Sequence, residues 1–362
     1  MLRANSNDYR HLFANDVPMI DTRAPIEFTQ GAFPNSVNLP LMTDDERAAV
    51  GTCYKQQGPE AAVKLGHKLV NGNIKAERVA LWKTFCEANP EGYLYCFRGG
   101  MRSQITQQWL KEAGIDYPFV IGGYKALRRF LIDTIDDVAT QPMTIVGGNT
   151  GSGKTILINE LKNGIDLEGA AHHRGSSFGR FVTQQRTQIN FENELAIQMV
   201  KKQDQNIRHF VYEDESNHIG SAKLPLSLSR TMPGADIAVI DDPFEIRLAR
   251  LIDEYVVNMQ RDFVAHYGEE LGWINFAEYL KKGMFNIRKR LGMQRYQSLA
   301  DAQQYAVKVM QDSGSLDHHR DWLVPLLEQY YDPMYTYQLS KKAERIIFRG
   351  NYQQVKEWLE SR

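Results

Sequence analysis

GNTGSGKT, residues 148–155, lies between an apolar run over residues 143–147 and a helical pattern over residues 156–162. The spacing G-x-x-x-x-G-K-[ST] between a strand and a helix predicts a Walker A loop. In such a loop the glycines let backbone N–H groups face phosphate oxygens, the lysine adds positive charge, and the threonine hydroxyl can hold Mg²⁺. We therefore expect a phosphate-binding site with Thr155 as the magnesium ligand. Its members are Gly148, Gly151, Ser152, Gly153, Lys154 and Thr155.

Two later apolar runs, residues 210–212 and 237–240, are predicted strands that end in acidic residues. Ligands of a P-loop fold lie at the carboxyl ends of its strands, so these acids are candidates for ordering a metal ion or its waters. Glu213 and Asp214 are the better candidates. Asp241-Asp242 fits a cap of the following helix equally well.

Between these two runs and the Walker A loop, residues 172–179 read HHRGSSFG. Small, polar and basic residues suit a second loop that contacts phosphate, in which His173 and Arg174 would take part. The same composition also suits an ordinary surface loop.

A second motif, YCFRGGMRS over residues 95–103, places Cys96 after a predicted strand and before a predicted helix. Backbone N–H groups, the helix dipole and two guanidinium groups would face the sulfur, which favours the thiolate and creates an anion pocket. We expect Cys96 to be catalytic. The expected anion loop consists of Arg98, Gly99, Gly100 and Arg102. The alternative is an inert cysteine that packs as a small apolar residue.

Short apolar runs alternate with helical patterns before residue 138, which predicts a parallel sheet covered by helices on both faces. The expected strands are residues 17–21, 36–39, 94–97 and 119–121. A polar break over residues 139–142 ends in proline and predicts a boundary between domains 1–138 and 139–362. After residue 253 the pattern is helical, with another strand at 345–348. The expected class is α/β, with a helical C-terminal extension.

The chain has 362 residues, of which 43% are hydrophobic and 24% charged, as in an ordinary soluble protein with two domains. A net charge of −1 gives no overall support for nucleic-acid binding. Cys53, Cys86 and Cys96 form neither a disulfide framework nor a zinc-binding pair. No apolar segment approaches the length of a membrane span or a leader, so we expect a cytoplasmic protein with no membrane partner.

The strongest candidate for a local RNA-binding surface is residues 281–295, which include six basic residues and no acidic one. Contacts to the RNA backbone would come from Arg288, Lys289 and Arg290. Basic helix faces are often simply solvated, which is the alternative interpretation.

The segments IDTRAPIEF, residues 20–28, and GAFPNSVNLP, residues 31–40, resemble the opening of a rhodanese domain, with Cys96 at its active-site cysteine. A rhodanese-like domain followed directly by a P-loop NTPase-like domain resembles the family of bacterial tRNA 2-selenouridine synthases. The motifs CFRGGMRS and HRGSSFG occur in the order found there, and the resemblance covers nearly the whole chain. Its specificity comes from the combination of motifs.

This resemblance implies a transferase that acts on 2-thiouridine at the wobble position of tRNA. The family first attaches a geranyl group from geranyl diphosphate to the sulfur, and then replaces the S-geranyl group with selenium from selenophosphate. The implied partners are tRNA and a selenophosphate-supplying enzyme. Pyrophosphate would leave from the Walker A loop, where Lys154 and a magnesium ion on Thr155 would stabilise the developing charge.

Five residues separate Cys96 from Arg102, which is longer than the usual sulfurtransferase loop. The spacing resembles that of rhodanese-like phosphatases and arsenate reductases, whose pocket holds a tetrahedral anion. Selenophosphate is such an anion, so the spacing favours a phosphorus-bearing donor. Cys96 would either take selenium as a perselenide or position the donor.

Three other functions remain open at the level of sequence. One is an ATP-dependent tRNA sulfurtransferase that uses a Cys96 persulfide, and another is a rhodanese-like phosphatase fused to a nucleotide-binding domain. The third is a non-catalytic RNA- or nucleotide-binding regulator. Intact Cys96, Arg102, Lys154 and Thr155 argue against this third function.

Overall fold

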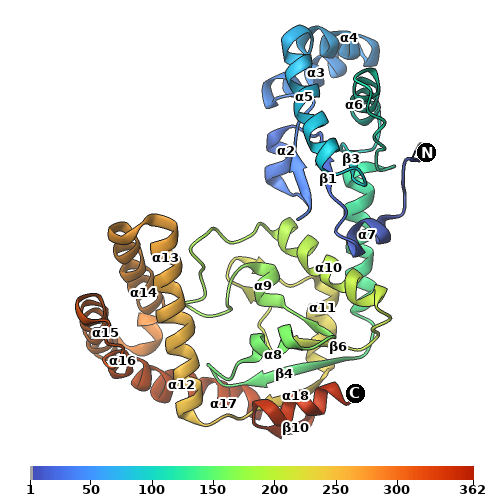
Figure 1. Cartoon of the computed structure of the whole chain (residues 1–362). Coiled ribbons are helices and arrows are strands. Elements are labelled where there is room, and N and C mark those ends of the chain that lie inside the picture. Colours follow the sequence, from blue (N-terminus) through green and yellow to red (C-terminus); the bar gives the residue numbers. More distant parts are fainter. Residues whose placement is uncertain (1–2) are drawn as a thin grey trace. The chain divides into compact units, whose positions relative to one another are not determined.

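The computed structural model describes residues 3–362, which group into two compact units (Figure 1). The first unit consists of the chain up to Val138 together with Glu192–Gln205, and the second consists of Ala139–Phe191 and Asn206–Arg362. Each unit combines helices with a parallel sheet, so the predicted α/β class is confirmed. Within residues 3–362, no helix is long and apolar enough to cross a membrane.

The first unit contains a three-stranded parallel sheet in the order β2-β1-β3. Its strands are β1 (Met19–Asp21), β2 (Ser36–Asn38) and β3 (Tyr93–Tyr95). Its helices are α1 (Tyr9–Ala14), α2 (Pro25–Gln30), α3 (Asp44–Gln57), α4 (Pro59–Leu69), α5 (Gly72–Ala88), α6 (Met101–Glu112), α7 (Gly123–Val138) and most of α10 (Gln188–Asp204). Ile20 and Leu94 from the strands share an apolar core with Trp82 and Trp109 from the helices. This core holds the end of β3, and therefore Cys96, in place.

Residues 119–121, expected as a strand, form only isolated bridges to neighbouring segments. The expectation is wrong because the chain turns at once through Gly122 and Gly123, both at positive φ, and leaves no length for a ladder. This turn supports the cysteine segment instead, since Tyr124 N donates to Cys96 O over 2.8 Å.

The second unit contains a five-stranded parallel sheet in the order β10-β9-β4-β6-β5. Its strands are β4 (Met143–Gly148), β5 (Gly164–Ile165), β6 (Phe210–Glu213), β9 (Asp236–Ile240) and β10 (Ile346–Gly350), and β7 (His218–Ile219) pairs antiparallel with β8 (Ala222–Lys223). The helices that alternate with these strands are α8 (Lys154–Glu160), α9 (Leu167–Ala171), α11 (Leu226–Thr231), η1 (Met232–Gly234), α12 (Phe244–Ile252), η4 (Ala343–Arg345) and α18 (Tyr352–Glu360). The Walker A loop follows the central strand, β4.

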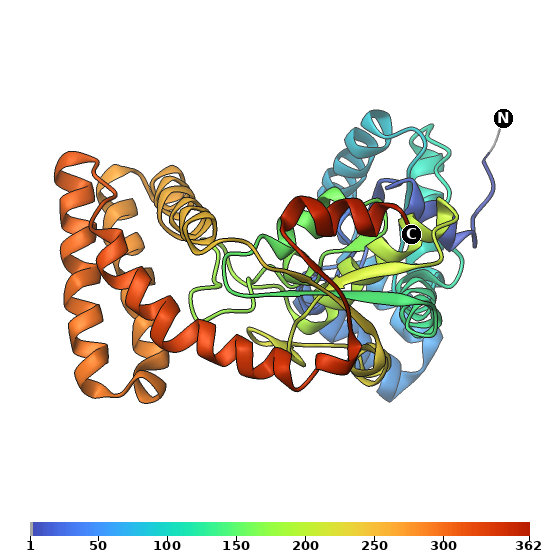
Figure 2. The same cartoon turned by 90° about the horizontal axis from the view of Figure 1, so that it is seen from below.

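Most of the chain after Ile252 is helical, and the orange and red segments of Figure 2 show these helices extending from the sheet of the second unit. They are the π-helical η2 (Asp253–Asn258), α13 (Met259–Tyr267), α14 (Glu269–Leu291), α15 (Met293–Ser313), α16 (His319–Leu326), the π-helical η3 (Leu327–Tyr331) and α17 (Asp332–Ser340). Phe276, Leu280, Met284 and Trp322 lie in the core that these helices share. The predicted helical extension is confirmed, and β10 returns the chain to the sheet.

Candidate functional site

The Walker A loop connects β4 to α8, as its sequence predicts. Gly148, Gly151 and Gly153 have φ angles of 150°, 80° and 84°, a region in which glycine is favoured. A Cβ on Gly151 would lie 2.5 Å from Arg247 O, so close packing against α12 also requires glycine there. Within the described chain, the N–H groups of Gly151, Gly153 and Lys154 donate to no protein acceptor. Such free N–H groups are suited to bind an anion.

The two polar side chains at the end of the loop already have protein partners. Lys154 Nζ donates to Gly148 O over 3.1 Å and lies 5.5 Å from the centroid of the Tyr335 ring. Thr155 Oγ1 donates to Glu168 Oε2 over 2.8 Å. Glu168 is on α9 and belongs to no sequence motif, so sequence reasoning missed it.

A second acid beside Glu168 is Glu215, which belongs to the acidic cluster after residues 210–212 but was not among the two candidates chosen from it. Burial raises the pKa of Glu168. Burial, with the neighbouring charge of Glu168, raises the pKa of Glu215 to about 8. Both shifts favour the protonated form of these carboxyl groups, next to the Walker A threonine.

The acids chosen from the sequence lie at the end of β6 but have structural partners. Glu213 is fully buried; its Oε2 accepts from Leu167 N over 3.0 Å and its Oε1 has no partner. Burial, reinforced by nearby acids, raises the pKa of Glu213 well above its usual value. Asp214 forms an ion pair with Lys342 at 2.6 Å. No group of three or more His, Cys, Asp or Glu side chains among residues 3–362 is arranged to hold a metal ion, so their metal-ordering role stays a prediction.

The capping alternative for Asp241-Asp242 is wrong, because α12 begins after Pro243 and has no side-chain cap. Asp242 instead accepts from Arg250 Nη1 over 2.5 Å and from Tyr352 N over 2.8 Å. It therefore ties α12 to the start of α18.

The loop that contains His173 and Arg174 lies against the acid pair. Gly175 packs on Glu215, since a Cβ at Gly175 would collide with Glu215 Oε2. The Arg174 guanidinium lies 4.4 Å and 5.2 Å from the ring centroids of Phe181 and Tyr255. His173 is buried. The fold thus brings this loop to the Walker A region, and its contact with phosphate stays a prediction.

In the first unit, Cys96 follows β3 and is only 3% exposed. The loop after it packs backbone against backbone, because Gly99 has a φ of 64° and a Cβ there would lie 2.7 Å from Gly122 N. In the part of the chain that the structure describes, the N–H groups of residues 97–102 donate to no protein acceptor. Consecutive N–H groups without a protein acceptor are expected in a loop that binds an anion.

The two arginines of this loop differ in their surroundings. Arg98 is exposed, whereas the half-buried Arg102 forms two hydrogen bonds with Glu27, Nη1 to Oε2 at 2.7 Å and Nη2 to Oε1 at 3.3 Å. Sequence reasoning missed Glu27, which lies on α2. It also passed over Ser103, whose fully buried hydroxyl has no hydrogen-bond partner among residues 3–362.

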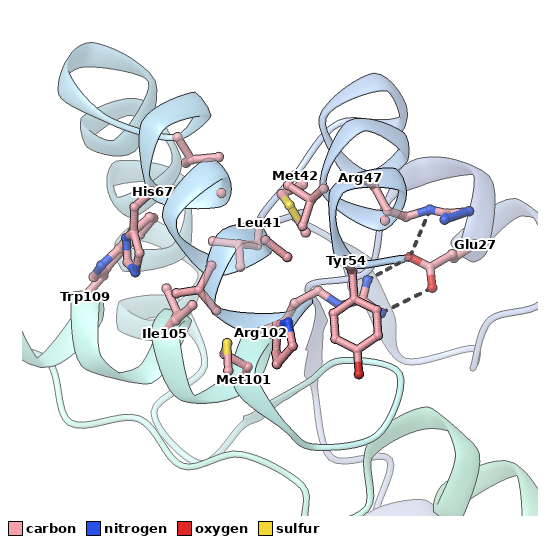
Figure 3. A pocket seen from close by; sticks show the side chains of 17 residues that line it. Glu27, Leu41, Met42, Arg47, Tyr54, His67, Met101, Arg102, Ile105 and Trp109 are labelled. Carbon is pink, nitrogen blue, oxygen red and sulfur yellow. Dashed lines mark hydrogen bonds and ion pairs between the residues drawn. The ribbon is translucent and has the colours of Figure 1, made fainter. Parts of the chain in front are cut away.

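A pocket with a volume of about 450 Å³ opens beside Arg102 (Figure 3). Most of its lining is apolar and comes from the segment before α3 and from α3, α4 and α6. These apolar residues include Leu41, Met42, Val50, Ala62, Val63, Val70, Met101, Ile105 and Trp109. Glu27, Arg47 and Arg102 make one side of the pocket charged, whereas Trp109 lies at the other end (Figure 3). No periodicity or motif in the sequence indicated this pocket.

The basic segment 281–295 is divided by Gly292, at a φ of 81°, between α14 and α15. Arg288 lies 3.5 Å from the centroid of the Phe285 ring, and Arg290 Nη1 is 3.3 Å from Tyr330 Oη. Lys289 is exposed. Cations in the last turn of a helix also interact favourably with its dipole, so their binding to RNA stays a prediction.

Residues 141–362 match the family described as tRNA 2-selenouridine synthase AAA domain. A relative from Photobacterium profundum, named tRNA 2-selenouridine synthase, is 68% identical over 359 residues, covering 99% of both chains. A relative with the same name from Serratia proteamaculans is 58% identical over 357 residues, covering 99% of this chain and 96% of that one. The N-terminal domain of a Clostridium difficile 630 protein named for ATP/GTP binding is 33% identical, covers 32% of this chain and 89% of that one, and has a TM-score of 0.30.

Proposed function

The chain belongs to the tRNA 2-selenouridine synthase family, and from this premise we propose that it converts 2-thiouridine in tRNA to 2-selenouridine in two steps. It is a tRNA-modifying transferase. The first step attaches a geranyl group to the sulfur, and the second replaces the S-geranyl group with selenium. Each step uses one of the two loops that present free N–H groups to an anion.

Geranyl transfer is assigned to the Walker A loop. The thiouridine sulfur attacks C1 of geranyl diphosphate, the C1–O bond breaks, pyrophosphate leaves, and the proton on N3 of the base is released. The N–H groups of Gly151, Gly153 and Lys154, together with the Lys154 ammonium, would hold the diphosphate and stabilise the charge on the leaving group. This step consumes no nucleotide.

Magnesium would assist at the same place. Thr155 and Glu168 offer a hydroxyl and a carboxyl oxygen within 2.8 Å of each other, which are the oxygen donors that Mg²⁺ accepts alongside substrate phosphates. A bound Mg²⁺ would neutralise charge on the departing pyrophosphate. Thr155 would have to release Glu168, or share it with the ion.

Selenium transfer is assigned to the first unit, which would have the rhodanese-like fold that its sequence resembles. Selenophosphate would bind to the free N–H groups of residues 97–102, beside Cys96 and Arg98. The observation that carries the proposal is the apolar pocket next to this loop, because an anion site alone does not require one. The selenium of selenophosphate would attack C2 of the base, the C2–S bond would break and geranylthiol would leave, and water would then cleave the P–Se bond to release phosphate and 2-selenouridine. The ten-carbon geranyl chain is the apolar group that this reaction brings to the cysteine, and the pocket would hold it during this step.

The proposed partners follow from these substrates. The tRNA supplies the modified base, and a selenophosphate-supplying enzyme must provide the donor. A cytoplasmic location fits both partners and the three free cysteines.

The test is a two-stage reaction with purified protein and tRNA that carries 2-thiouridine. Geranyl diphosphate alone should give S-geranyl-2-thiouridine, and later addition of selenophosphate should give 2-selenouridine, both measured by mass spectrometry of the nucleosides. Radiolabelled ATP should remain unhydrolysed in the same mixture. Dependence of either product on ATP would instead support the sulfurtransferase alternative.

A further inference from the structure

Glu27 does not belong to the anion loop, but it contacts Arg102, which does. Its carboxylate accepts from both terminal nitrogens of Arg102, at 2.7 Å and 3.3 Å, and its Oε2 lies 3.7 Å from Arg47 Nε (Figure 3). Burial acts to raise the pKa of Glu27, but the hydrogen bonds and charge of Arg102 outweigh it and hold that pKa below the usual value. The carboxylate is therefore ionised at neutral pH and neutralises part of the charge of Arg102.

A second glutamate–arginine ion pair in the same unit provides a comparison, because neither of its residues belongs to the anion loop. Glu46 accepts from Arg78 Nη2 at 2.7 Å and 3.0 Å, and Arg78 Nη1 also donates to Leu41 O. Glu27 and Glu46 are both the third residue of a helix and both accept from the backbone N–H of the residue before that helix. The two pairs differ at the arginine, because the Arg102 guanidinium has no hydrogen-bond partner besides Glu27 in residues 3–362.

The contact with Glu27 leaves part of the guanidinium free. Arginine has five N–H donors in a rigid planar fork, of which Glu27 takes one from each terminal nitrogen. Three N–H groups remain, of which the Nε–H and one terminal N–H lie on the same edge, and two parallel N–H groups are the arrangement that binds an oxyanion in a bidentate manner. Arg102 also immediately follows the free N–H groups of the anion loop and precedes Ser103, whose buried hydroxyl lacks a partner.

We propose that Glu27 is a positioning residue that holds the Arg102 guanidinium so that its unused edge can bind the tetrahedral anion of the Cys96 loop. This inference rests on the proposed use of that loop for selenophosphate. Without Glu27, the arginine side chain, which already lines the adjoining pocket, would be free to adopt other orientations there, and binding the anion would require it to be ordered again. Glu27 itself touches neither the anion nor the sulfur.

The experiment measures protection of Cys96 from iodoacetamide by inorganic phosphate, with the full chain and without tRNA. Alkylation is followed on the Cys96 peptide by mass spectrometry, because the Walker A loop also binds phosphate and would confuse a bulk binding measurement. Glu27→Gln is the test variant, since glutamine can still accept the helix-capping hydrogen bond. Glu46→Gln is the matched control, because it weakens an equivalent pair away from the loop.

We expect Glu27→Gln to require about tenfold more phosphate for half protection, which is the loss typical of charge-assisted hydrogen bonding. In Glu46→Gln, half protection of Cys96 should require the same phosphate concentration as in the unmodified protein. We expect this even if Glu27→Gln and Glu46→Gln lower the unfolding temperature by similar amounts. Arg102→Gln should lose protection, and adding Glu27→Gln to it should cause no further loss, because the two residues act as one unit.

Two results would overturn the inference, and they are distinguishable. If phosphate protects the unmodified protein and Glu27→Gln equally, or protects the variant at lower concentration, Glu27 does not position Arg102. If phosphate never protects Cys96, even in the unmodified protein, the anion loop is not a phosphate site, and the proposed selenophosphate function fails with the inference.

Discussion

Thr155 Oγ1 donates a 2.8 Å hydrogen bond to Glu168 Oε2, which joins the last residue of the Walker A loop to an acid on α9. Glu168 lies beside Glu215, against which Gly175 packs, and burial raises the pKa of both carboxyl groups. The predicted phosphate site is therefore bordered by two acids whose protonated form is favoured. Deprotonation of these acids would oppose the binding of an anionic ligand, so we expect the site to be sensitive to pH.

Replacement of Cys96 by serine should abolish selenium incorporation while leaving geranylation largely intact. The thiolate is needed only where the chalcogen is handled, and a hydroxyl cannot replace it as a nucleophile at neutral pH. Nucleoside mass spectrometry should show S-geranyl-2-thiouridine accumulating in the variant. A variant that can neither geranylate nor selenate would contradict this division of labour.

Replacement of Lys154 by alanine should abolish geranyl transfer while the protein remains folded. Its ammonium donates only to Gly148 O within the described residues, so the core loses little. Loss of a charge that stabilises a leaving group typically lowers a rate by about 100-fold or more. The checks are the initial rate of geranyl transfer and the circular dichroism spectrum. Transfer at an unchanged rate would show that geranyl diphosphate binds elsewhere.

Replacement of Glu215 by glutamine should stabilise the second unit at alkaline pH. The pKa of Glu215 is about 8 in the folded chain against 4.5 as the ordinary value, so the folded state binds the proton more tightly. Stability therefore falls as pH rises through this window, and glutamine removes that loss. At pH 9 the variant should gain more than about 1 kcal/mol in urea unfolding, and close to nothing at pH 4.

The control for this measurement is Glu360→Gln, which changes an exposed glutamate of the same unit. Its unfolding free energy should follow that of the unmodified protein at both pH values. Equal stability of Glu215→Gln and the unmodified protein at pH 9 would mean that Glu215 is ionised in the folded chain without penalty.

Filling the apolar pocket with Val63→Phe should slow selenation of S-geranyl tRNA and leave the first step unaffected. Val63 lines the pocket from α4, and a phenylalanine ring there would occupy space that the geranyl chain requires. We expect KM for the geranylated tRNA to rise about tenfold, in line with the apolar area that the chain would fail to bury. Lys64→Phe, on the exposed face of α4, is the control. If Val63→Phe and Lys64→Phe have similar kinetics, the pocket does not bind the geranyl chain.

Reversal of Arg288, Lys289 and Arg290 to glutamate should weaken tRNA binding and flatten its salt dependence. Each lost phosphate contact removes about one unit from the slope of log affinity against log salt concentration. Lys289 is the most informative single change, because Arg288 and Arg290 already contact Phe285 and Tyr330. Geranyl diphosphate binding, measured by calorimetry, should not change. If the tRNA affinity and the slope of its salt dependence are both unaltered, these three residues only stabilise the end of their own helix.

Local spacing in the sequence was enough to predict several parts of this protein. Gly148, Gly151 and Gly153 could be placed correctly because a loop that turns around phosphate requires backbone angles that only glycine adopts readily. Cys96 could be placed at a strand end for a similar reason, since an apolar run followed by glycines ends a strand. The α/β class followed from alternating periodicities, and the helical extension from their change after residue 253.

The contacts between side chains of different segments could be seen only in the folded chain. Glu27 reaches Arg102 across 75 residues, and Glu168 lies beside both Thr155 and the more distant Glu215, because these side chains come from segments that follow different strands. The sequence around a glutamate does not indicate such a partner, because glutamate is equally common on solvated helix faces. The sequence did not indicate the apolar pocket either. Its lining comes from separate segments, and from the sequence their apolar residues would be assigned to the core.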